Sequence, residues 1–144
     1  MSLLLLVHAG ATVFMVGVIW FVQVVHYPLF GLVGTDGFVP YSDAHSRRTG
    51  YVVGPPMLVE AATAILLLIY RPDGVPAILL WGGALLLAIV WASTAFLQVP
   101  RHTRLGAGFD DAAYRGLVAT NWIRTLAWTL RGILVLAMLA LAGN

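Results

Sequence analysis

The chain has no cysteine, no lysine and very little charge. Only 10% of its 144 residues are charged, whereas an ordinary soluble domain carries about 25%. The lack of cysteine excludes disulfides, cysteine-ligated zinc and thiolate-bound haem. All eight basic residues are arginine, and the net charge of +2 is too small to indicate a nucleic-acid partner. Because 60% of the residues are hydrophobic, most of the surface must face lipid.

Four apolar runs approach or exceed the roughly 20 residues needed to span a bilayer. They cover residues 3–25, 51–70, 75–99 and 117–141. The sequence therefore predicts an all-α fold, an integral membrane four-helix bundle in a single domain. No basic residues precede the first run, so we expect it to be a retained helix and not a cleavable signal peptide.

The connections between these runs differ in kind. Residues 71–74 read Arg-Pro-Asp-Gly, which predicts a tight turn and an antiparallel pair of helices. The first connection, 26–50, is long, and Pro28 predicts an early break in it. Residues 41–48 predict a short polar helix in this connection, leading into the second span.

The third connection and the arginines predict the orientation. Residues 100–116 form this connection, and Asp110 predicts that the last helix begins before the membrane, since aspartate caps helix starts. The first and third connections lie on one side and hold Arg47, Arg48, Arg101, Arg104 and Arg115, against only Arg71 on the other side. The positive-inside rule then predicts a cell-membrane protein with both connections in the cytoplasm and both termini outside.

Three charges fall inside the predicted spans. A charge at the centre of a spanning helix costs about 2.5–3.5 kcal/mol, so we expect these charges to be paired or functional. Glu60 lies roughly 13 Å and Arg124 roughly 10 Å from the cytoplasmic start of its helix, at 1.5 Å per residue, so the two are predicted to meet. Arg131 lies deeper. The pair would either stabilise the bundle or form a charged site that binds or activates a ligand.

Polar residues form stripes at helical spacing. In the fourth span the residues Asn121, Arg124, Thr125, Trp128 and Arg131 share one face. Gln98 and His102 follow the same pattern in the third span, and Gln23 and His26 end the first. Because polar stripes facing lipid are expensive, these stripes should face one another. They would join the helices or line a site.

Three histidines are predicted on the cytoplasmic side: His26, His45 and His102. Together with Glu60 they could bind iron, zinc or copper, or two of them could ligate haem. They could also be interfacial residues that bond to the backbone or to lipid headgroups. Tyr41 precedes His45 by one turn and could join the same site. His8, near the start of the chain, is predicted to lie alone at the outer leaflet.

Residues 99–105 and 120–125 resemble a known membrane family. Small four-helix proteins of the anthrone-oxygenase-like family carry a proline, a polar residue two places later and a leucine after the third helix. They then carry a tryptophan, an asparagine or histidine, and Arg-Thr at the start of the fourth. Length and helix number agree throughout, and the motifs cover the last third. Named members oxidise polycyclic anthrones to quinones. The resemblance implies site roles for Asn121 and Arg124, and His102 departs from the family's usual asparagine.

A looser resemblance concerns architecture alone. Haem-containing bacterial protoporphyrinogen oxidases are also four-helix membrane proteins of this size, with a histidine early in the first helix, as His8 is here.

These patterns favour a membrane oxidoreductase that acts on a lipophilic substrate. The candidate catalytic residues are Glu60, Arg124 and Asn121, and the candidate substrate contacts are Gln98, Trp128, Arg131 and Tyr41. The alternative is an accessory subunit of a larger membrane complex or homo-oligomer, in which the polar residues join helices or ligate haem or a pigment. Transport is less favoured, because the polar stripe of the fourth span ends at Arg131.

Overall fold

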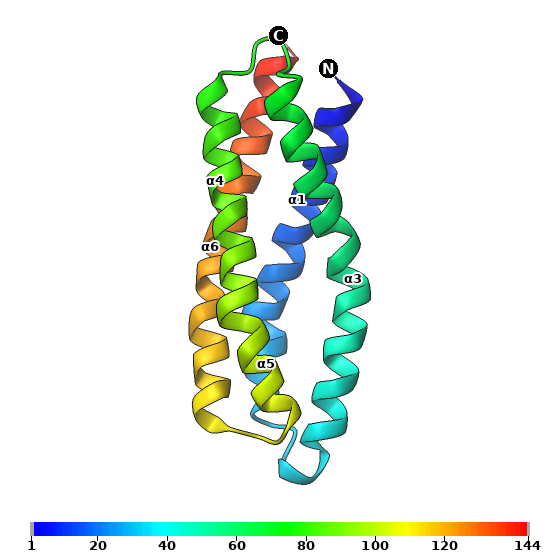
Figure 1. The fold of residues 1–144 in the computed structure, drawn as a ribbon, viewed down its shortest axis with the longest axis vertical. Coiled ribbons are helices and arrows are strands. Elements are labelled where there is room, and N and C mark those ends of the chain that lie inside the picture. Colours follow the sequence, from blue (N-terminus) through cyan, green and yellow to red (C-terminus); the bar gives the residue numbers. More distant parts are fainter. Residues whose placement is uncertain (1, 144) are drawn as a thin grey trace.

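The computed structural model describes residues 2–143, and within that range the chain is helical, without a strand. Four long helices stand side by side (Figure 1). The first consists of α1 (Leu3–Phe21), the π-helical turn η1 (Val22–His26) and α2 (Tyr27–Phe30), and the second is α3 (Thr35–Ile69). The third consists of α4 (Ala77–Ser93), η2 (Thr94–Gln98) and α5 (Val99–Gly106), and the fourth is α6 (Asp111–Ala142). The predicted all-α, four-helix architecture is confirmed.

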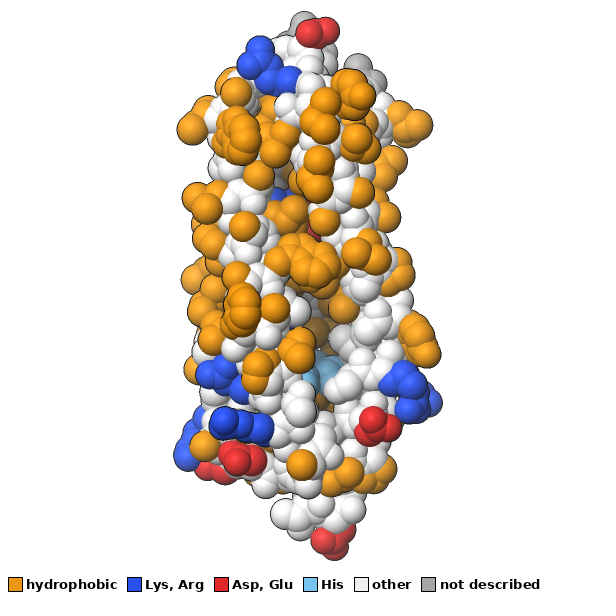
Figure 2. Space-filling model, in the orientation of Figure 1, with side chains coloured by type: hydrophobic (Ala, Val, Ile, Leu, Met, Phe, Trp, Pro, Cys, Tyr) orange, Lys and Arg blue, Asp and Glu red, His pale blue; other side chains and the backbone are white. Residues whose placement is uncertain are grey.

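The two ends of the bundle differ in charge. One end, called here the terminal end, holds both termini and the connection 70–76 (Figure 1). The other, called the arginine-rich end, holds connections 31–34 and 107–110. Charged side chains gather there, and hydrophobic ones cover most of the surface between the ends (Figure 2).

Each of the four helices is long and apolar enough to cross a membrane. They contain 28, 35, 30 and 32 residues. At 1.5 Å per residue even the shortest measures about 42 Å, whereas the hydrocarbon core of a bilayer is about 30 Å thick. The helices are therefore longer than the apolar layer, and charged side chains gather over their arginine-rich ends (Figure 2).

The first connection is much shorter than the sequence indicated. We expected a long connection over 26–50 broken early by Pro28, but the helix continues through Pro28 and only residues 31–34 are non-helical. The polar segment 41–48 is not a separate helix, because it forms the first part of α3 without a break. The prediction for the last helix is confirmed: α6 begins at Asp111, and the Asp110 carboxylate accepts the Ala113 N–H at 2.7 Å.

Two π-helical turns explain how the first and third helices continue past Pro28 and Pro100. Pro28 and Pro100 have no N–H, and their rings crowd the carbonyl four residues back. Each follows a π-helical turn, η1 or η2, in which the residue before the proline bonds to the carbonyl five residues earlier. The wider turn lets both helices continue towards the arginine-rich end, and such turns occur frequently at functional sites.

The orientation in the membrane can be tested with single cysteines, because the chain has none of its own. Asp36 and Asp73 are exposed at opposite ends. If the arginine-rich end is cytoplasmic, a membrane-impermeant maleimide added to intact cells labels the Asp73→Cys variant and leaves Asp36→Cys unlabelled until the membrane is permeabilised. The reverse pattern would show that the arginine-rich end faces outward.

Candidate functional site

A buried ion pair joins all four helices in the terminal half of the bundle. Arg131 on α6 donates from Nε to Glu60 Oε1 on α3 at 2.9 Å, and its Nη2 lies 2.9 Å from the same oxygen. Thr12 on α1 also donates to Oε1, at 2.8 Å, and Trp128 donates from Nε1 to Oε2 at 3.0 Å. Arg131 Nη1 donates to the Gly83 carbonyl on α4. Every helix thus contributes a group to this cluster.

The predicted pairing of Glu60 with Arg124 is wrong, since Glu60 pairs with Arg131. The start of an apolar run does not mark the start of its helix, because α3 and α6 both begin earlier than the runs at 51 and 117. Both helices finish at the terminal end, so counting back from there gives the true level. Glu60 lies about 14 Å and Arg131 about 17 Å from that end of its helix, against about 27 Å for Arg124.

The Arg124 guanidinium is surrounded by neutral groups. Nε donates to Asn121 Oδ1 at 2.9 Å, and Nη2 donates to the Tyr27 hydroxyl at 3.2 Å. Nη2 also reaches Gln98 Oε1 at 3.5 Å, and Nη1 has only a 3.4 Å contact with Thr94. Among residues 2–143 no carboxylate forms an ion pair with Arg124, although its side chain is only 9% exposed.

The two π-helical turns hold Arg124 in place. Each places a glutamine inside the bundle, Gln23 at 3% and Gln98 at 1% exposure. Gln23 accepts a hydrogen bond from the Asn121 amide at 2.8 Å, which leaves Asn121 Oδ1 directed at Arg124. Gln98 is itself anchored on Thr120 at 2.9 Å. Asn121 is fully buried behind Arg124, so its role is to position the guanidinium.

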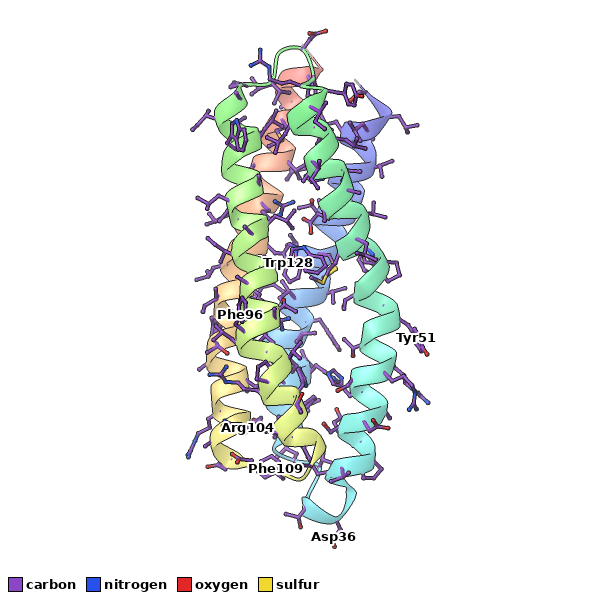
Figure 3. All side chains as sticks on the ribbon, in the orientation of Figure 1. Asp36, Tyr51, Phe96, Arg104, Phe109 and Trp128 are labelled. Atoms are coloured by element: carbon purple, nitrogen blue, oxygen red, sulfur yellow. The ribbon has the colours of Figure 1, made fainter. Side chains whose placement is uncertain are left out.

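A cavity of about 470 Å³ lies beside Arg124. Its polar wall is formed by Arg124, Tyr27, His45, His102, Gln98 and Ser42, and its apolar wall includes Met15, Ile19, Met57 and Trp128. Along α3 the lining runs from Ser42 and His45 near the arginine-rich end to Met57, about three to four turns deeper. Trp128 lies in the centre of the bundle (Figure 3). The cavity is therefore polar towards the arginine-rich end and apolar towards the middle of the bundle.

The three predicted histidines do come together. His26 Nε2 and His45 Nδ1 share a hydrogen bond of 2.7 Å, and the rings of His45 and His102 stack with centroids 5.4 Å apart. The Tyr27 hydroxyl lies 3.0 Å from His102 Nε2. Glu60 is not with them. Over residues 2–143, no three histidine or carboxylate side chains are arranged to hold a metal ion, so binding of a metal or haem stays a prediction.

Two buried polar atoms in residues that line the cavity have no partner among the described residues: Ser42 Oγ and His102 Nδ1. The Tyr27 oxygen accepts from Arg124, which leaves its own O–H to donate to His102 Nε2. The neutral His102 ring then carries its proton on Nδ1. Ser93 Oγ and Arg131 Nη2, which do not line the cavity, are in the same state. Buried polar groups are almost always hydrogen-bonded, so the two atoms in the cavity wall are free to bond a polar group that enters it.

The other predicted residues lie outside the cavity wall. Tyr41 packs its ring near His26 and Phe30, while Arg131 and Glu60 form the deeper ion pair. His8 is 2.7 Å from Thr63 Oγ1 and does not join the other histidines.

Two residues of the cavity wall, Tyr27 and Ser42, were not predicted from the sequence. The signal for Tyr27 was the proline that follows it, since a proline inside a helix can impose a π-helical turn. Ser42 gave no such signal.

No protein-family model, curated protein or solved structure matches this chain. The resemblances noted in the sequence therefore remain expectations, and function has to be inferred from the geometry of the site.

We predict that removing one partner of the Glu60–Arg131 ion pair strongly lowers the stability of the bundle. Removing one partner leaves the other charge buried, so Glu60→Ala should lower the free energy of unfolding by about 3–5 kcal/mol, and Glu60→Leu combined with Arg131→Met should restore most of it. Equilibrium unfolding in detergent micelles measures both.

The exposed pair Arg115–Asp111, 73% and 58% exposed, is the matched control, and Arg115→Ala should cost less than about 1 kcal/mol. Equal losses for Arg115→Ala and Glu60→Ala would contradict the assignment of the buried pair as the main electrostatic contact.

Proposed function

We propose that this chain is an integral membrane enzyme, with its arginine-rich end in the cytoplasm, that binds a lipophilic molecule bearing an acidic or enolisable oxygen and removes a proton from it. The observation that carries the proposal is Arg124, a buried cation in the wall of a cavity with only neutral partners.

The charge balance favours an anionic ligand. Glu60, the only glutamate in the chain, is taken by Arg131. Asp43, at the rim of the cavity, is exposed and lies 3.4 Å from Arg47. A buried charge without a counter-charge is costly. An anionic oxygen on the ligand would supply that counter-charge through charge-assisted hydrogen bonds with Arg124.

The histidine pair supplies a base. His45 lines the cavity and is held through Nδ1 by His26 and Thr49, at 2.7 and 3.1 Å. When Nδ1 donates its proton to His26, Nε2 of His45 is an unprotonated acceptor, and no described residue bonds to it. A histidine oriented by a second group in this way is suited to general-base work. His45 is therefore assigned as the base and His26 as the residue that orients it.

Two donors would hold the oxygen that becomes negative. Arg124 offers its guanidinium N–H groups, and His102 offers Nδ1–H. Fixed donors in a water-poor site stabilise a developing oxyanion strongly, and removing one commonly costs about 10²–10³ in kcat. The apolar wall that includes Met57 and Trp128 would accommodate the body of the substrate.

Removal of the proton converts the substrate into an enolate, and an enolate is readily oxidised. Dioxygen is the oxidant in this reaction: a CH₂ group conjugated with the carbonyl system becomes C=O, one oxygen atom enters the product, and the other leaves as water. This is the chemistry that the anthrone-oxygenase resemblance implies, and it would make the protein an oxidoreductase.

The test uses purified protein with a tricyclic anthrone as the probe. Quinone absorbance and oxygen uptake measure turnover, and ligand-dependent thermal shift measures binding. Arg124→Gln and His45→Gln should lower turnover by about 10²-fold or more, since one loses an oxyanion donor and the other the base. Arg104→Gln and His8→Gln are the matched controls, because Arg104 is exposed and neither residue lines the cavity.

Wild-type turnover in folded Arg124→Gln and His45→Gln would contradict the proposal, as would a folded wild-type protein that neither binds nor oxidises the probe. An absorption spectrum and metal analysis of the same preparation separate the cofactor-bearing alternatives. A Soret band would show haem, and stoichiometric iron, zinc or copper without that band would show a histidine metal site.

A further inference from the structure

Small side chains line the seam between α3 and α5. Ser42, Ser46 and Gly50 follow one another at four-residue intervals on α3, and Thr103 and Gly106 lie on α5. All five line the cavity beside Arg124. Residues four apart share one helix face, so the two helices present small residues to the same opening.

These glycines do not serve close helix packing. Small residues usually let neighbouring helices approach closely, but a Cβ at Gly50 or Gly106 would meet nothing within 4 Å. By contrast, a Cβ at Gly116 would lie 2.6 Å from Arg101 Nε. The seam is thus unfilled. Figure 2 shows a hollow between these helices, with histidine side chains visible inside it.

The unpartnered hydroxyl of Ser42 is the second observation that points to a ligand. It is 1% exposed, lines the cavity at the seam, and its Oγ has no hydrogen-bond partner among the described residues. A buried hydroxyl in this state is suited to bond a group that enters through the seam.

The polarity of the cavity runs in the same direction as that of a membrane leaflet. Its polar wall, with His102 and Arg124, lies towards the arginine-rich end, and its apolar wall, with Met15 and Met57, lies towards the middle of the bundle. An amphiphile in the neighbouring leaflet has its head group and its apolar body in the same order. It could therefore move sideways into the cavity without turning over.

A second groove, between α1 and α3, is a weaker candidate for an entrance. It has a volume of about 420 Å³ and is lined by Gly17, Phe21 and Arg48. Four residues line both this groove and the cavity and stand between the two spaces: Val18, Val22, Thr49 and Val53. No glycine lies in that wall, whereas the α3–α5 seam has one on each side.

We propose that the α3–α5 seam is a lateral entrance through which an amphiphile, whose head group is a single acidic or enolisable group, passes from the leaflet at the arginine-rich end into the cavity. This inference rests on the proposed function for the identity of the head-group contact, Arg124, and adds the route and the orientation of the molecule: head group at Arg124 and His102, tail at Met15 and Met57.

The test uses the full chain in liposomes and a long-chain carboxylic acid with a photoactivatable diazirine near its tail end. After illumination, mass spectrometry maps the labelled residues. In the wild-type protein, labels should fall on Met15, Met57 or their neighbours. Gly50→Leu and Gly106→Leu should each lower the initial rate of this labelling by about tenfold, because they narrow the access that limits association.

Two glycine variants serve as controls. Gly10 is exposed on α1 and, like Gly50, would place a Cβ in open space, so Gly10→Leu should label as the wild type does. Gly17→Leu narrows the other groove and should also leave labelling unchanged. Thermal unfolding of each variant confirms that it is folded.

Three results would each overturn the seam as the entrance. They are wild-type labelling rates in both Gly50→Leu and Gly106→Leu, loss of labelling only in Gly17→Leu, and labels confined to the lipid-facing surface.

The Arg124→Gln variant, measured in parallel, separates this proposal from the proposed function. If it alone loses cavity labelling, the seam fails while the anion site stands. If it labels and turns over like the wild type while the glycine variants are blocked, the proposed function fails and the entrance stands.

Discussion

The ion pair between Glu60 and Arg131 is the contact on which the rest of the structure depends. It brings groups from all four helices to one level, since Thr12 and the Gly83 carbonyl bond to the same two side chains. It also decides the charge of the site. Two arginines and one carboxylate lie deep within the helices, so saturating Glu60 leaves Arg124 without a counter-charge. The contact that stabilises the bundle thereby leaves Arg124 as the positive charge that, in the function proposed above, an anionic ligand would balance.

The prolines of the first and third helices also contribute to this site, through the shape of the backbone and not through charge. Because a π-helical turn precedes each of Pro28 and Pro100, the two helices place Gln23 and Gln98 opposite α6. The Gln23 amide anchors Asn121, which holds Arg124, and the Gln98 amide contacts Arg124 itself. The turn before Pro28 also places the Tyr27 hydroxyl against the guanidinium. Two π-helical turns at matching depths thus place the side chains that form part of the polar wall of the cavity.

The sequence predicted the four helices, the common face from Asn121 to Arg131 and the meeting of three histidines, because each depends on composition or helical spacing. It did not predict the partner of Glu60. Hydropathy marks where the apolar run begins, whereas pairing depends on where the helix begins, and α3 starts 16 residues before Tyr51. The cavity and its seam could not be predicted either, since they depend on which facing side chains fail to fill the space between helices.

The length of α3 has a consequence for the surrounding membrane. Measured back from Ile69, Gly50 lies about 29 Å along the helix, close to the thickness of the hydrocarbon core. If the hydrocarbon layer starts at Ile69, the seam begins where acyl chains give way to head groups. Lipid bilayers differ in thickness by several ångströms, and helices adapt to the difference at modest energetic cost. A thicker membrane would immerse the seam among acyl chains and a thinner one would leave it among head groups, so lipid composition would itself control how readily substrate reaches Arg124.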